Sequence, residues 1–80
     1  MLMEVPLSTI RSGERVVVRR ILGGGAGMMG RLASLGFTPG AEINMVQNYG
    51  RGPIIVQLRG TRVALVRGEA SRVVVAQSEP

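Results

Sequence analysis

A glycine pattern typical of phosphate-binding loops is the first candidate for chemistry in this sequence. Residues 25–30 match the spacing Gly-x-Gly-x-x-Gly, follow a strand pattern and open a helical pattern. A dinucleotide site also requires an acidic residue about 20 positions further on, where this chain has Gln47 and Asn48. A P-loop requires Lys and then Ser or Thr after the last glycine, and Arg31 and Leu32 stand there instead. The glycines therefore predict a flexible connection before a helix, and no cofactor.

Catalytic and metal-ligating side chains are scarce. The sequence contains no His, Cys, Asp or Lys, and its 5 acidic residues are glutamates that never fall close together. General acid–base or nucleophilic catalysis would depend on these carboxylates, on scattered hydroxyl groups and on Tyr49. Met28, Met29 and Met45 are soft sulfur donors, but their placement is typical of side chains that fill gaps in a core. We therefore expect no enzyme activity, no small-molecule substrate and no metal site.

The charge of the chain indicates an acidic partner surface, nucleic acid or an anionic membrane. All 10 basic residues are arginines, and the net charge of +5 is large for 80 residues. Nucleic-acid binding is an alternative function, because arginines neutralise phosphates. However, small barrels that bind single strands stack bases on aromatic side chains, and the only aromatic residues here are Phe37 and Tyr49. The arginines are also spread over nearly every expected element, which makes nucleic-acid binding the less favoured function.

The elements that would position these residues are short strands around one helix. Met28, Leu32 and Leu35 share one face of a short helix between the first two strands. Residues 5–10 form an extended lead-in to the first strand, and residues 67–71 have room for one helical turn before the last strand. Apolar alternation predicts five strands, at residues 15–22, with a bulge near Arg19 and Arg20, and at residues 41–47, 54–59, 62–66 and 72–76.

A sharp helix-to-strand turn lies at the centre of this pattern, in Leu35-Gly36-Phe37-Thr38-Pro39-Gly40. Gly36 suits the left-handed position after a helix, and Phe37 follows where an apolar side chain folds back onto the last turn. Pro39 cannot continue the helix, and Gly40 frees the backbone to enter a strand. The stretch predicts a structural turn that places the only Phe inside the fold.

These elements predict a mostly β fold. Five short strands can hide their edges only by closing on themselves, so we expect a small five-stranded SH3-like barrel rather than an OB-fold. Residues 1–80 form a single domain, with a core over about 7–76 anchored by Leu7 and Ile10, and a frayed tail at residues 77–80.

Outward-facing apolar residues indicate a docking surface for another protein. If the inward strand residues form the core, Val17, Ile55 and Val74 point outward, and Met29 flanks the buried face of the helix. Apolar side chains among arginines are typical of protein contact patches. We therefore predict partner contacts at Met29, Arg31, Ile55 and Val74.

Nearly the whole chain resembles the FeoA family, small cytoplasmic proteins of ferrous iron transport with an SH3-like domain. The Leu-Gly-Phe-x-Pro-Gly element is the most specific part of the resemblance, and the other pieces are informative through their order. The matching pieces are Gly13-Glu14 with Val18 and Ile21, Arg31-Leu32 with residues 35–40, Gly52-Pro53 with Val56 and Leu58, Gly60 before Val63-Ala64-Leu65, and Ala70 with Val73 and Val75.

The resemblance implies a non-catalytic adaptor or regulator of bacterial ferrous iron uptake. The implied partner is the membrane iron transporter FeoB, bound through its cytosolic GTP-binding part, and the implied location is the cytoplasm, at the inner face of the membrane through that partner. Weak self-association through exposed strand edges is a further expectation. The same barrel occurs as the C-terminal domain of iron-dependent repressors, so a regulatory domain is the related alternative. Apolar runs of only about four residues are too short to span a bilayer.

Overall fold

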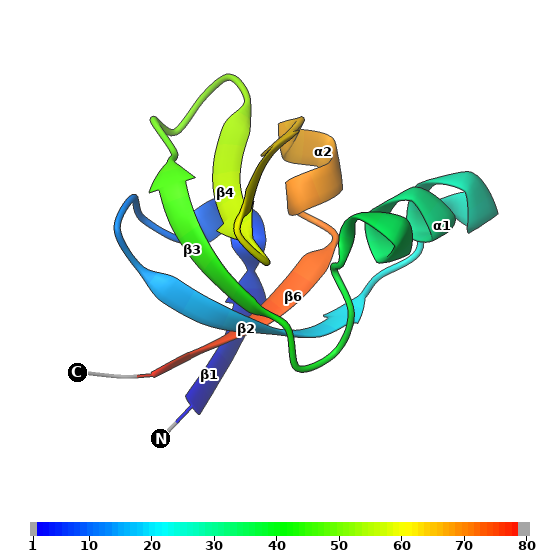
Figure 1. Cartoon of the computed structure of the whole chain (residues 1–80), viewed down its shortest axis with the longest axis horizontal. Helices are drawn as coiled ribbons and strands as arrows, with labels where there is room; N and C mark the ends of the chain where they lie inside the picture. Colours follow the sequence, from blue (N-terminus) through cyan, green and yellow to red (C-terminus); the bar gives the residue numbers. More distant parts are fainter. Residues whose placement is uncertain (1, 79–80) are drawn as a thin grey trace.

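The computed structural model describes residues 2–78, which form one antiparallel sheet with helical segments beside it (Figure 1). The strand order is β1-β6-β2-β3-β4-β5. In chain order the elements are β1 (Leu2–Pro6), the 3-10 helix η1 (Leu7–Thr9), β2 (Arg15–Ile21), α1 (Gly25–Leu35), β3 (Glu42–Gln47), β4 (Ile54–Leu58), β5 (Thr61–Leu65), α2 (Arg67–Ala70) and β6 (Val73–Ser78).

The sheet has six strands where the sequence predicted five. The additional strand is β1, which pairs with β6 from Leu2 opposite Ser78 to Pro6 opposite Val74. Its few residues show no clear alternation and end in a proline, which an edge strand tolerates. Because β1 is stabilised by a partner at the other end of the sequence, the local pattern could not reveal it. Residues 77 and 78 of the expected frayed tail therefore belong to β6, and residues 79–80 lie outside the described residues.

The expected closure of the barrel is also corrected. β1 and β5 are the two ends of the strand order, and no strand pairing joins them within residues 2–78. Glu4 and Pro6 on β1 and the exposed Arg62 on β5 are residue types that discourage unwanted strand addition. The fold thus keeps two open strand edges where the sequence suggested closure, and the residue types on them discourage pairing with chains of unsuitable sequence.

The hydrophobic core lies inside the curve of the sheet. The inward residues of each strand alternate with exposed ones, as on β4, where Ile54, Val56 and Leu58 are buried and Gln57 is exposed. The expected anchors of the N-terminal segment are confirmed, because Leu7 and Ile10 are both buried. The largest fully buried side chains are Phe37, Leu7, Ile10, Leu32, Ile43, Met45, Ile54 and Leu65.

The turn after α1 has the expected geometry. Gly36 is left-handed, with φ 107°. Its N–H donates to the Ala33 carbonyl at 3.0 Å, and the Phe37 N–H donates to the Leu32 carbonyl at 3.0 Å, which is the Schellman pattern. Phe37 is buried in the core. The difference lies at Leu35, which is partly exposed because the helix ends there and only Leu32 is fully buried along it.

Replacing Gly36 in the helix cap and Gly30 within α1 with alanine should change the free energy of unfolding in opposite directions. Alanine at Gly36 is expected to lower the free energy of unfolding by about 1–2 kcal/mol, because a Cβ is unfavourable in the left-handed region. That Cβ would also lie 3.2 Å from Leu58 Cδ2. Alanine at Gly30 is expected to raise the free energy of unfolding by about 1 kcal/mol, because this position is helical and the added Cβ has no heavy atom within 4 Å. Urea denaturation measures both, and a stabilising Gly36→Ala would refute the cap.

Asn48, at the start of the β3–β4 loop, connects that loop to two other segments. Its Nδ2 donates to the carbonyls of Ser8 at 2.9 Å and Ile10 at 2.7 Å. Its Oδ1 accepts from the Gly50 N–H at 3.1 Å and from Arg67 Nη1 at 3.0 Å. Arg67 Nη2 donates to the Ser8 carbonyl at 3.2 Å. The N-terminal segment, the β3–β4 loop and α2 are thereby joined at one point.

The predicted bulge and helical turn are both present. The pairing of β2 with β6 shifts register between Val18 and Arg20, so Arg19 is the extra residue. The helical turn before the last strand is α2, and its Ala70 is buried. The bulge determines where the side chain of Arg20 projects, and α2 determines where that of Glu69 projects. Both side chains contribute to the surface described next.

Candidate docking surface

Helix α1 presents an almost uncharged face to solvent. Only Leu32 is fully buried along it, and Met28 is half-buried against the core. Met29 is 41% exposed, and the neighbouring exposed side chains of Ala26 and Ala33 are small and apolar. Figure 1 shows α1 projecting beyond the sheet at one side of the molecule. Met29 is therefore accessible, and its contact with a partner stays a prediction.

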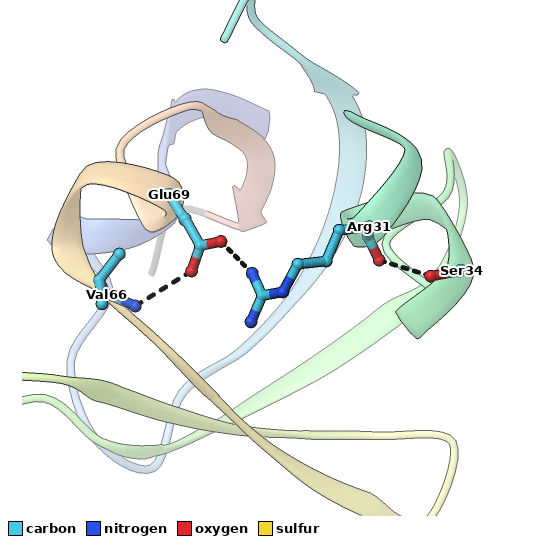
Figure 2. Close-up of polar contacts among 4 residues, drawn as sticks. All are labelled: Arg31, Ser34, Val66 and Glu69. Atoms are coloured by element: carbon cyan, nitrogen blue, oxygen red, sulfur yellow. Dashed lines mark hydrogen bonds and ion pairs between the residues drawn. The ribbon is translucent and has the colours of Figure 1, made fainter. Parts of the chain in front are cut away.

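Arg31 fixes the position of α1 and does not project freely. Its guanidinium forms an ion pair with the carboxylate of Glu69 on α2 (Figure 2). The other carboxylate oxygen of Glu69 accepts the Val66 N–H at 3.3 Å, so both oxygens are engaged. The Ser34 hydroxyl donates to the Arg31 carbonyl at 2.8 Å. Arg31, predicted as a partner contact, thus lies at the surface in an ion pair between α1 and α2, and half of its side chain is exposed.

Ile55 lies on the outer face of β4 and is half-buried. Its register neighbours are Gln47 on β3 and Ala64 on β5. The outward orientation expected from alternation is therefore present. Met29 and Arg31 belong to α1, which projects away from β4 at one side of the molecule (Figure 1). The structure does not gather the predicted contact residues into one cluster.

The expectation that Val74 is exposed is wrong. Val74 is only 7% exposed, and Ala76 on the same face of β6 is equally buried. Val74 lies between Pro6 and Arg20 in the register, and residues directly opposite each other share a face of the sheet. Glu4 and Arg20, on the strands flanking β6, form an ion pair of 2.7 Å across it. The additional strand β1 thus covers the outer face where the sequence suggested an open patch.

A groove that the sequence did not predict lies between the last turn of α1 and the β4–β5 hairpin. Its volume is about 340 Å³. The hairpin turn is Arg59-Gly60, with φ 54° and 77°, so the strand expected over residues 54–59 ends one residue earlier, at Leu58. The residues around the groove are Ser34, Leu35 and Gly36 from the helix end and Leu58, Arg59 and Val63 from the hairpin. The sequence pattern contains no sign of this groove, because it places Leu35 on the buried face of the helix and the groove forms between segments distant in sequence.

The arginines are distributed over the whole surface. Arg15 pairs with Glu42, Arg19 and Arg20 both pair with Glu4, and Arg31 pairs with Glu69. Arg67 instead donates to carbonyl oxygens and to Asn48. The basic charge therefore does not form a single stripe along one element.

The carboxylates of the described residues are held by structural contacts. Glu14 accepts the Arg11 N–H at 2.8 Å and Gln77 Nε2 at 2.7 Å, and the other three described glutamates form ion pairs. Over residues 2–78, no three His, Cys, Asp or Glu side chains lie close enough together to hold a metal ion. In the same part of the chain, no helix combines the length and apolarity needed to cross a bilayer.

A curved antiparallel sheet with one helix between its second and third strands defines a small SH3-like domain. The same fold is found in the zinc complex of Stenotrophomonas maltophilia FeoA, reported as a prokaryotic SH3 domain protein, with a TM-score of 0.80, 37% identity and coverage of 89% of this chain and 88% of that one. Residues 5–77 match the FeoA domain family. The chain therefore belongs to the FeoA family.

Two further relatives agree with this assignment. A Methanocaldococcus jannaschii protein named "Putative Fe(2+) transport protein A" is 35% identical over 74 residues, which cover 92% of this chain and 88% of that protein. The crystal structure of an iron uptake regulatory protein (FeoA) has a TM-score of 0.87 and 41% identity, and covers 95% of this chain and 100% of that chain. The chain is thus assigned to ferrous iron transport as an accessory protein of this family.

The likeness to iron-dependent and manganese-dependent repressors is one of fold. A manganese-dependent transcriptional repressor has a TM-score of 0.86 at 22% identity, with 98% of this chain matching 44% of that one. The barrel is therefore shared with part of a larger regulator, while the family assignment follows from the FeoA relatives.

Proposed function

We propose that this protein is a non-catalytic adaptor in the cytoplasm that regulates ferrous iron uptake by docking on the cytosolic GTP-binding part of a FeoB-type transporter. The observation that carries the proposal is the exposed, nearly uncharged face of α1, held in place on the domain. Membership of a family of iron transport proteins supplies the class of partner. The engaged carboxylates support a binding role in place of a catalytic one.

The composition of α1 supports a role in recognition. Gly27 and Gly30 weaken the helix, since each glycine inside it costs up to about 1 kcal/mol relative to alanine. No acidic side chain supports its first turn. Such a helix depends on Leu32, on the Schellman cap and on the Arg31–Glu69 ion pair. An exposed apolar face on a helix of low intrinsic stability is typical of a contact surface.

The test is a pull-down of the protein with the cytosolic domain of the cognate transporter, with and without GTP, at two salt concentrations. Binding that depends on GTP is the expected result for a regulatory adaptor. Failure to bind under all four conditions would contradict the proposed docking site on the GTP-binding part.

Substituting Met29 with Glu should weaken docking at least about tenfold, because burying an unpaired carboxylate in an apolar contact is unfavourable. Isothermal titration with the transporter domain measures the change. Arg51→Gln is the matched control, since it lowers the net charge by the same amount on the exposed β3–β4 loop. Equal affinities of Met29→Glu and the control, with the fold intact, would remove α1 from the interface. Ile55→Glu tests the outer face of β4 in the same way.

A further inference from the structure

β5 leaves one side of its backbone unpaired. It is the last strand of the sheet and pairs only with β4 within residues 2–78. Leu58 and Thr61 close the two-residue hairpin and form a hydrogen-bonded pair, and hydrogen-bonded and non-hydrogen-bonded pairs alternate along antiparallel strands. Arg62 and Ala64 therefore direct their N–H and C=O groups away from β4. Neither residue contributes to a backbone hydrogen bond from a turn or loop in the described chain.

The groove lies directly beside this open edge. Thr61 and Val63 of β5 form one wall, and Ser34 and Leu35 of the last turn of α1 form the other. A chain added along β5 would occupy the space between them. Its alternate side chains would point into the groove, where Val63, Leu35 and Leu58 present apolar surface. The edge and the groove are therefore two parts of one site for an extended segment.

The charge at this site favours a segment with carboxylates. Arg59 lies at the end of the groove, and its side chain reaches Gly36, where a Cβ would lie 3.5 Å from Arg59 Nε. Neither Arg59 nor Arg62 forms an ion pair within residues 2–78, and no acidic residue lines the groove. Arg59 also occupies a left-handed position, φ 54°, which is unfavourable for a long side chain. Strain of this kind is typical of functional positions.

We propose that β5 and the adjoining groove bind an extended segment of the docking partner by strand addition, with apolar side chains in the groove and carboxylates on Arg59 and Arg62. This inference rests on the proposed function, since the segment belongs to the transporter's cytosolic part. Main-chain hydrogen bonds to Arg62 and Ala64 supply affinity, and the groove and arginines supply selectivity. A second copy of this chain is a poor occupant, because β5 contains no carboxylate that could pair with Arg59 and Arg62.

The decisive variant is Ala64→Pro, with Ala64→Val as its matched control. Proline removes the outward N–H without touching the β4 ladder, a position at which edge strands accept it. Valine keeps the N–H and suits a strand. With the transporter domain, Ala64→Pro is expected to bind at least about tenfold more weakly than the wild type, while Ala64→Val binds equally. Equal binding of both variants, each with a native circular dichroism spectrum, would overturn strand addition and leave the proposed function standing.

A peptide probe separates failure of the inference from failure of the proposed function. An acetylated, amidated heptapeptide of alternating Glu and Val is titrated into the isotopically labelled protein, with a Lys and Val heptapeptide as the charge control. Saturable amide shifts in β5 and at residues 33–36, seen only with the acidic peptide and weakened several-fold by Arg59→Asn, are expected. Asn accepts the left-handed position, so the turn is retained. Absence of saturable peptide binding up to about 1 mM would overturn the inference. It would also be overturned if sedimentation showed that Ala64→Pro changes only the self-association of the protein.

Discussion

Replacing Phe37 with alanine is expected to lower the free energy of unfolding by about 3–5 kcal/mol. Phe37 is the largest fully buried side chain, and its own backbone N–H donates to the Leu32 carbonyl as part of the helix cap. Domains of this length have a total stability of roughly 4–12 kcal/mol, so the loss is a large part of the whole. Urea denaturation followed by circular dichroism measures it.

Phe37→Leu is the control for this prediction. Leucine keeps most of the buried apolar surface and should be destabilising by no more than about 1–2 kcal/mol. A loss below about 1 kcal/mol for Phe37→Ala would contradict the central position of the ring in the core.

Replacing Asn48 with alanine is expected to cost about 2–4 kcal/mol. The side chain makes four hydrogen bonds, and its removal leaves the Ile10 carbonyl without its side-chain donor and the Ser8 carbonyl with Arg67 alone. Each unsatisfied buried group costs about 1–3 kcal/mol, partly offset where water reaches it. Thermal and urea denaturation should both show the loss, and hydrogen exchange should accelerate in the N-terminal segment and the β3–β4 loop.

Asn44→Ala is the matched substitution, since Asn44 is exposed on β3 and makes no side-chain hydrogen bond within residues 2–78. It should change stability by no more than about 0.5 kcal/mol. If the two variants are equally stable, Asn48 does not join the three segments as described.

The parts of the fold that the sequence predicted depend on short-range restrictions. Gly36 can adopt the left-handed conformation that other residues avoid, and Pro39 fixes its own φ, so the turn and the burial of Phe37 follow from local chemistry. The alternation of Ile54, Val56 and Leu58 likewise identifies a strand and its inward face. The bulge at Arg19 was visible because it interrupts such an alternation.

The parts that could not be predicted depend on contacts between distant segments. Alternation shows that Val74 faces outward, but not that Pro6 and the Glu4–Arg20 pair cover it. Arg31 was recognisable as a surface arginine, while its partner Glu69 is 38 positions away. The groove exists because α1 and β5 approach each other in space. Met29 and Ile55 remain predicted contact residues, since alternation and exposure identify accessible side chains and not their partners.

The place of β6 in the sheet also determines when the protein can fold. This strand follows all the others in sequence, yet it lies between β1 and β2. On the ribosome, the two N-terminal strands therefore have no partner between them until β6 has emerged. At about 5–20 residues per second, the nascent chain spends several seconds with the apolar face of β2 incompletely covered. The pairings of β1 and β2 with β6 can therefore form only after nearly the whole domain has been synthesised.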